Sequence, residues 1–183
     1  MKDRRKIILN AKDLRKATSS VILSRVKNLK CNEIYIVLDN VLDTYNIGSI
    51  FRLADAVAAK KIFLCGGTEI PPNHRIKKAS INTTEVVEWS YAESAAKVIK
   101  DLRFKIKDIK IITVEQSTKS IPYDQFKYTL PVCLIVGNES DGVSKEVLNA
   151  SDAIVELPMF GVNKSLNVMV SLGIVLYEAI EKT

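Results

Sequence analysis

The stretch that decides the fold of this chain is LPMFGVNKSLNVMVSLG, residues Leu157–Gly173. It begins at the end of an apolar run, opens into a polar loop and returns to apolar residues at helical spacing. Ser165 or Asn167 is expected to cap that helix, because either side-chain oxygen can accept its first free N–H groups. A polar loop held between a buried strand and a buried helix commonly binds a small ligand through backbone groups. The alternative is an ordinary connection between a strand and a helix.

Strand-like and helical segments alternate on the N-terminal side of this stretch. Runs rich in β-branched and apolar residues predict strands over 33–38, 62–65, 109–114, 132–136 and 153–157. Apolar residues at helical spacing predict helices over 46–59, 91–104, 143–149 and 167–181. Asn46 is expected to cap the first helix, and Pro71-Pro72 makes residues 68–90 the least regular part. The alternation predicts an α/β fold with a mostly parallel sheet and helices on both faces.

Polar loops follow several of the predicted strands. In parallel sheets, ligands collect at the edge where the strands end. We therefore expect Asn46, Glu115, Glu139 and the loop over 157–167 to lie within reach of one another.

Positive charge is concentrated in the first 30 residues. This segment has ten Lys or Arg against two Asp, a net charge of +8, whereas the whole chain carries +6. Residues 12–29 place apolar side chains at helical spacing, which predicts a basic amphipathic helix as an extension of a domain over 31–183. Such a helix would attract the phosphates of RNA or DNA; alternatively, it only aids solubility. The residues expected to contact RNA are Arg4, Arg5, Lys6, Lys12, Arg15 and Lys16, with a second patch at Arg75 and Lys78.

Composition excludes several classes of protein. No apolar run approaches the roughly 20 residues that cross a bilayer, and the first residues lack the apolar core of a signal peptide. We therefore expect a cytoplasmic protein that does not associate with a membrane. The three cysteines are far apart, show no metal-site spacing and are expected to be small core residues rather than metal ligands. His74 is the only histidine, which argues against a Ser-His-Asp triad.

Three segments of the chain carry motifs that occur together in one known family. They are Asn46–Arg52 (NIGSIFR), Ile135–Gly142 (IVGNESDG) and the stretch Leu157–Gly173. Together they resemble the SpoU/TrmH family of RNA ribose 2′-O-methyltransferases in the SPOUT superfamily. The family motifs are N-x-G-x-x-x-R, G-N-E-x-x-G after a strand, and P-M-x-G-x-x-x-S-L-N-V before the last helix. All three occur in order, and the resemblance covers roughly residues 33–181.

The resemblance implies a C-terminal trefoil knot, at about 130–183, that periodicity does not show. It also implies a homodimer that binds S-adenosyl-L-methionine in the knot, with the active site at the subunit interface. Carried over by motif position, the contacts to this cofactor fall on Thr113, Gly137, Leu157, Met159, Ser165 and Leu166. Leu157 stands where the family often has isoleucine.

The resemblance also implies which residues act on the substrate. Transfer of a methyl group to a ribose hydroxyl requires alignment of oxygen, methyl and sulfur, and loss of a proton from a weakly acidic hydroxyl. The family assigns Arg52 to that hydroxyl. Because a guanidinium stays protonated, Arg52 is expected to hold a phosphate and stabilise negative charge on the oxygen rather than act as a base. The remaining residues expected at the catalytic site are Asn46, Glu139, Ser165 and Asn167.

Two alternatives to this enzyme remain open at the level of sequence. One is a non-catalytic RNA-binding protein with the same knotted fold, and the other is an α/β protein for a different nucleotide. The chain also departs from many relatives at Ser80–Thr84 (SINTT), which has no glycine. Of tRNA and rRNA, tRNA is the expected substrate, because a short basic extension without an added domain resembles the tRNA enzymes of the family.

Overall fold

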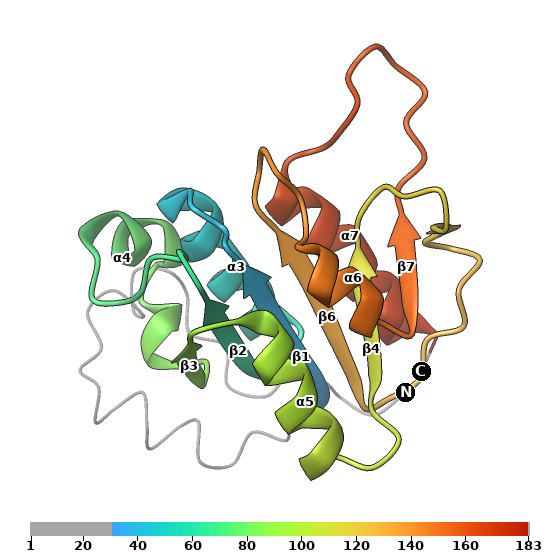
Figure 1. Ribbon diagram of the computed structural model, residues 1–183. Helices are drawn as coiled ribbons and strands as arrows, with labels where there is room; N and C mark the ends of the chain where they lie inside the picture. The colour runs from blue at the N-terminus through green and yellow to red at the C-terminus, as the bar shows by residue number, and fades with distance from the viewer. Residues whose placement is uncertain (1–30, 183) are drawn as a thin grey trace.

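The core of the protein is one parallel sheet. The computed structural model describes residues 31–182 (Figure 1). Its seven strands follow the order β3-β2-β1-β6-β4-β7-β5, and every pair of neighbours is parallel. The strands are β1 Asn32–Asp39, β2 Ala59–Cys65, β3 Trp89–Ala92, β4 Lys110–Val114, β5 Ile121–Pro122, β6 Val132–Gly137 and β7 Ala153–Glu156. The predicted α/β fold with a parallel sheet is confirmed.

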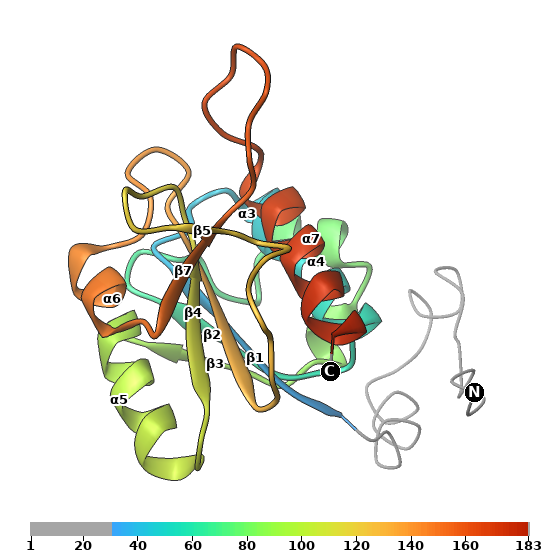
Figure 2. The same cartoon turned by 90° about the vertical axis from the view of Figure 1, so that its right-hand side faces the viewer.

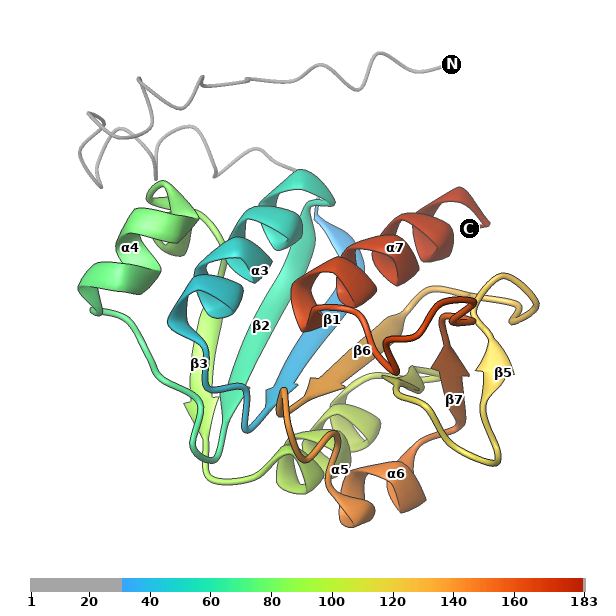
Figure 3. The same cartoon turned by 90° about the horizontal axis from the view of Figure 1, so that it is seen from above.

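Helices cover both faces of the sheet (Figure 3). The helices are α3 Thr44–Ala56, α4 His74–Ser80, α5 Ala95–Lys105, α6 Lys145–Ala150 and α7 Val168–Glu181, with a 3-10 turn η1 at Thr83–Glu85. Alternate residues of β1 divide between two cores: Ile34, Ile36 and Leu38 pack under α3 and α7, whereas Tyr35 and Val37 pack under α5 and α6. Burial on both faces explains why the strands are apolar nearly throughout.

The strand order shows how the C-terminal third is threaded. Strand β7 follows β5 and β6 in the sequence but pairs with β4 on one side and β5 on the other. The segment between β4 and β6, which contains β5, therefore passes on the outer side of β7. The chain later returns as β7, between β4 and β5, and then continues into α7 (Figure 2). The fully buried Tyr128 anchors this outer connection in the core under α7 and donates a hydrogen bond to the Tyr123 carbonyl at 2.9 Å.

Two local predictions are wrong. The sequence predicts residues 68–90 as the least regular part and no helix there, yet α4 begins directly after Asn73, whose side chain accepts hydrogen bonds from the Arg75 and Ile76 N–H groups. The prolines excluded a helix only as far as their own positions. The helix predicted over 91–104 begins instead at Ala95 with Ser94 as its cap, because Trp89–Ala92 adds to the open edge of β2 as a strand.

Residues 1–30, with the predicted basic helix and six of the predicted RNA contacts, lie outside the described residues. Within 31–182, no helix is both long and apolar enough to cross a membrane. Cys65 and Cys133 are buried as expected, whereas Cys31 is exposed.

Candidate active site at the carboxyl edge of the sheet

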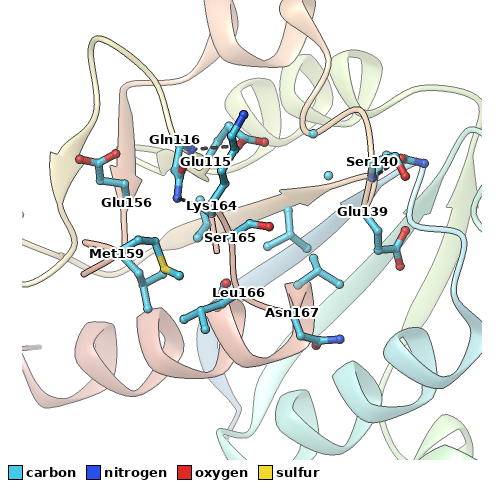
Figure 4. A pocket seen from close by; sticks show the side chains of 18 residues that line it. Glu115, Gln116, Glu139, Ser140, Glu156, Met159, Lys164, Ser165, Leu166 and Asn167 are labelled. Atoms are coloured by element: carbon cyan, nitrogen blue, oxygen red, sulfur yellow. Dashed lines mark hydrogen bonds between the residues drawn. The ribbon is translucent and has the colours of Figure 1, made fainter. Parts of the chain in front are cut away.

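A cavity of about 440 Å³ opens where β4, β6 and β7 end, at the edge where parallel sheets bind ligands. Glu156 and Met159 lie on one side of it and Glu139 and Ser140 on the other (Figure 4). Its volume is within the range of small-molecule sites. The residues that line it are Val114, Glu115, Gln116, Val136, Gly137, Asn138, Glu139, Ser140, Gly142, Glu156, Leu157, Met159, Lys164, Ser165, Leu166, Asn167, Val168 and Ser171.

Most residues that the motifs singled out line this cavity. They are Gly137, Glu139, Leu157, Met159, Ser165, Leu166 and Asn167. Thr113 is not in the lining: it is fully buried one residue before the cavity, and its hydroxyl lies 2.6 Å from the Ser151 hydroxyl. The predicted meeting of the polar loops is confirmed, because residues from all three motifs come together here.

A chain of side-chain hydrogen bonds joins the three motifs. Asn46 Nδ2 donates to Glu139 Oε1 at 2.9 Å, and Asn167 Nδ2 donates to Asn46 Oδ1 at 2.9 Å. Asn167 Oδ1 in turn accepts from the N–H groups of Met169 and Val170 and caps α7. Asn46 does not line the cavity; it links two residues that do.

The two ends of this chain demand the same orientation of the amides. An ionised Glu139 can only accept, so Asn46 must turn its NH₂ group toward it and its carbonyl oxygen toward Asn167. At the other end, the free N–H groups of α7 require the oxygen of Asn167, which leaves its NH₂ group for Asn46. The chain is therefore fixed from both sides.

Glu139 is held as a carboxylate. Besides Asn46, it accepts the Leu42 N–H on Oε2 and the Asp43 N–H on Oε1, each at 3.1 Å. Burial alone would raise the pKa of Glu139, but the hydrogen bond from Asn46 and those from the backbone outweigh it and lower the pKa below its ordinary value.

One of the two predicted caps is correct. Asn167 caps α7. The cap of α3 is Asp43, whose side chain accepts from the Tyr45 and Asn46 N–H groups. Asn46 lies inside the first turn, so its side chain is free to reach across to Glu139 and Asn167.

The turn after β6 is packed too tightly for larger residues. A Cβ on Gly137 would lie 2.4 Å from the backbone of Gly142, which bonds back to Asn138 through both backbone groups. Gly142 has a φ of +70°, and Glu115 Oε2 accepts the Val143 N–H at 2.9 Å beside it. This turn therefore forms a rigid wall of the cavity.

Two groups of predicted residues lie away from the cavity. Arg52 is exposed on α3 and makes no hydrogen bond or ion pair with the part of the chain that the structure describes. It lies six residues beyond Asn46, which is roughly 9 Å along a helix, and it does not line the cavity of its own chain. Arg75 and Lys78 are exposed on α4.

Several lining residues were not predicted from the sequence. Gln116 follows β4 and donates from Nε2 to the Lys164 carbonyl, which ties the base of the 157–167 loop to the sheet. Glu156 ends β7, and Lys164 lies in the loop itself. The rule that ligands gather at the ends of parallel strands could have indicated Gln116 and Glu156.

The lining is acidic overall. Glu115, Glu139 and Glu156 contribute three carboxylates, against one ammonium from Lys164. Such a cavity favours a ligand with positive charge. The inserted β7 and this cavity at the strand ends define the class of the molecule: a threaded α/β protein with a small-molecule site beside its last helix.

Comparison with known proteins gives the particular family. A profile of the SpoU rRNA Methylase family matches residues 33–177. The chain is 33% identical over 161 residues to the tRNA (guanosine(18)-2′-O)-methyltransferase of Aquifex aeolicus, covering 86% of this chain and 73% of the relative. It is 30% identical over 155 residues to the 23S rRNA (guanosine-2′-O-)-methyltransferase RlmB of Neisseria meningitidis, covering 84% of this chain but only 60% of that relative.

Solved structures agree. The crystal structure of the A. aeolicus TrmH/SpoU tRNA modifying enzyme superposes with a TM-score of 0.75 at 30% identity, over 88% of this chain and 84% of that one. The AdoMet-bound rRNA methyltransferase of Sinorhizobium meliloti gives 0.76 at 28% identity, over 92% and 59%. The chain belongs to the SpoU/TrmH family of RNA ribose 2′-O-methyltransferases and has the knotted SPOUT fold.

Proposed function

We propose that this protein transfers a methyl group from S-adenosyl-L-methionine to a ribose 2′-hydroxyl of tRNA. The observation that carries the proposal is the Glu139–Asn46–Asn167 chain, which unites the three family motifs at the wall of one cavity. A protein that only bound RNA would not require this arrangement beside a pocket of cofactor size.

The cavity fits the cofactor in charge and size. When bound, S-adenosyl-L-methionine supplies a methyl group on a positively charged sulfonium. The carboxylates of Glu115, Glu139 and Glu156 complement that charge. Gly137, Met159 and Leu166 also line the cavity and are proposed contacts to the cofactor.

Ser165 and Asn167 are polar residues that line the cavity on the return of the loop, and they are the proposed contacts to the ribose. Asn167 is held by Asn46 and Ser165 lines the cavity beside it. Groups held in place before the substrate arrives reduce the cost of aligning it.

A second subunit would complete the site. Arg52 does not line the cavity of its own chain, so we propose that Arg52 of the partner subunit reaches it in a homodimer. Val170 and Tyr177, which lie seven residues apart on α7 and so share a face, are 40% and 52% exposed. A second copy would cover them. Val170→Glu with Tyr177→Glu should give a monomer by light scattering, whereas Phe104→Glu on α5 should not.

tRNA is proposed over rRNA because the Aquifex tRNA enzyme, at 33% identity, is more similar to the chain than the Neisseria rRNA enzyme, at 30%. Basic residues at 1–30, together with Arg75 and Lys78, are the proposed phosphate contacts. Deleting residues 1–12 should weaken RNA binding and flatten its salt dependence without changing the affinity for the cofactor.

The test is transfer of labelled methyl from S-adenosyl-L-methionine to bulk RNA, separated into tRNA and rRNA before counting. We expect label in tRNA. Arg52→Ala should abolish transfer and leave binding of S-adenosylhomocysteine nearly unchanged, whereas Lys100→Ala, an exposed cation on α5, should leave both unchanged. Failure of the wild type to label any RNA, despite binding RNA, would support the non-catalytic alternative.

A further inference from the structure

We propose that Phe160 is a stacking platform for an unpaired base of the RNA substrate and that Lys164 holds a neighbouring phosphate. The proposal rests on the proposed function, because it names how the same site takes hold of its RNA. It concerns the tip of the 157–167 loop, which extends away from the body of the molecule in two perpendicular views (Figures 1 and 2).

Nothing in the described chain packs against this tip. Phe160 is 97% exposed and Val162 is 102% exposed, and a Cβ on Gly161 would have no atom within 4 Å. Covering an apolar ring that is fully exposed to water lowers the free energy of the system. A single exposed apolar residue needs no explanation by itself; the position of Phe160 supplies one.

Phe160 does not line the cavity, but residues on both sides of it in the loop do. Met159, one residue earlier, lines the cavity, and Lys164 and Ser165 line it on the return of the loop. The base of the loop is tied down by the Gln116 bond to the Lys164 carbonyl and by the Asn167 bond to Asn46. A ribose that enters the cavity therefore brings its own base or the next one close to a ring on a firmly anchored loop.

The charge on the same loop fits a nucleic acid. The Lys164 ammonium is four residues from Phe160 in the sequence and makes no hydrogen bond or ion pair within the described residues. An exposed aromatic ring and an unpaired cation on one short loop match a base and a nearby phosphate. The alternative occupant is a second copy of the chain, but the core of a protein interface is depleted in lysine.

Stacking on Phe160 restricts the substrate. Bases inside a duplex stack on one another and offer no free face to a side chain, so the base that meets Phe160 must come from a loop, bulge or single strand. The proposed substrate is therefore a structured RNA with its target nucleotide at or beside an unpaired position.

The experiment measures RNA binding by fluorescence anisotropy, with end-labelled bulk tRNA and, in parallel, labelled fragments of bulk rRNA, in saturating S-adenosylhomocysteine. Phe160→Ala should weaken binding of the preferred RNA about tenfold, within the range for loss of one stacked base. Phe160→Trp should bind as the wild type does, and Phe160→Leu should stay close to Phe160→Ala, because leucine is apolar but has no aromatic face.

Two matched controls separate stacking from general apolar contact. Phe104, 91% exposed on α5, is an equally bare phenylalanine at the opposite end of the sheet, so Phe104→Ala should leave RNA binding unchanged. Val162→Ala removes the other apolar group of the tip and should have less than a twofold effect. Affinity for S-adenosylhomocysteine and the oligomeric state should be the same in all variants.

The outcomes are distinct. Wild-type RNA affinity in Phe160→Ala would overturn the stacking platform. So would wild-type RNA affinity in Phe160→Leu or dissociation of a dimer in Phe160→Ala, and these two results would favour a protein contact instead. A wild type that binds neither RNA would also overturn the platform. RNA binding with the expected pattern but without methyl transfer would instead overturn the proposed function and leave the platform standing.

Discussion

The chain Glu139–Asn46–Asn167 and the loop tip Phe160–Val162 lie at the same edge of the sheet but are built in opposite ways. In the chain, Glu139 accepts three hydrogen bonds from other residues and both ends of each amide are engaged. At the tip, two apolar side chains stand in water and a glycine has no neighbour. The difference separates a fixed wall, which we propose positions the cofactor, from an open rim, which we propose is left for the substrate.

The largest expected effect contrasts one glycine from each region. Gly137→Ala should lower the free energy of unfolding by about 3 kcal/mol, because its Cβ would lie 2.4 Å from backbone atoms that cannot move aside. Gly161→Ala should be neutral or slightly stabilising, because its Cβ meets nothing and the unfolded chain loses freedom. Urea unfolding of both variants tests this, and similar costs at the two sites would remove the contrast.

A smaller effect is expected from Asn46, the middle residue of the hydrogen-bonded side chains Glu139–Asn46–Asn167. Asn46→Asp should cost about 2 kcal/mol at neutral pH, because the new carboxylate cannot donate to Glu139 and repels it. The matched control is Asn149→Asp, an exposed position on α6, which should stay within about 0.5 kcal/mol of the wild type. Thermal unfolding measures both, and an equal cost would mean that the chain contributes nothing specific to the fold.

A binding effect should separate the wall from the rim. Glu156→Gln should weaken the binding of S-adenosyl-L-methionine about threefold more than the binding of S-adenosylhomocysteine, because only the former carries the sulfonium charge. The effect is modest because the Glu156 side chain is partly exposed. Titration calorimetry with both ligands gives the ratio. Glu146→Gln, exposed on α6, should leave it unchanged, and an unchanged ratio in Glu156→Gln would argue against electrostatic selection.

The smallest effect concerns pH. The folded protein lowers the pKa of Glu139 below its ordinary value of 4.5, so the stabilisation by its carboxylate is present above that value and is lost as the pH falls through the lower folded pKa. Between about pH 5 and pH 3, the wild type should therefore lose more unfolding free energy than Glu139→Gln. Denaturant unfolding across this range tests the sign, and parallel curves would show that Glu139 is not linked to folding.

Sequence was most informative where periodicity and local chemistry act alone. The longer strands of the sheet can be predicted because burial on both faces makes their sequences continuously apolar. Asn167 can be predicted as a cap because capping depends only on residues that are close in the sequence. Strand β3 was missed because its residues become a strand only through the open edge of β2. Local sequence predicts Asn46 as a cap and does not show its bond to Asn167, because that bond joins residues 121 positions apart and only the fold creates it.

The open rim was equally hard to foresee. Met159 and Phe160 are adjacent apolar residues in the same motif, yet one lines the cavity and the other is 97% exposed. Composition treats both as core residues. Only the path of the loop decides between them, because it turns one side chain inward and carries the other away from every neighbour.

The most direct test of the central claim is mass spectrometry of nucleosides from bulk tRNA treated with the protein and isotopically labelled S-adenosyl-L-methionine. The fixed wall and open rim predict label in a single 2′-O-methylated nucleoside, lost in Gly137→Ala and retained in Gly161→Ala. Label on a base, or none in any RNA from a protein that binds S-adenosylhomocysteine, would contradict it.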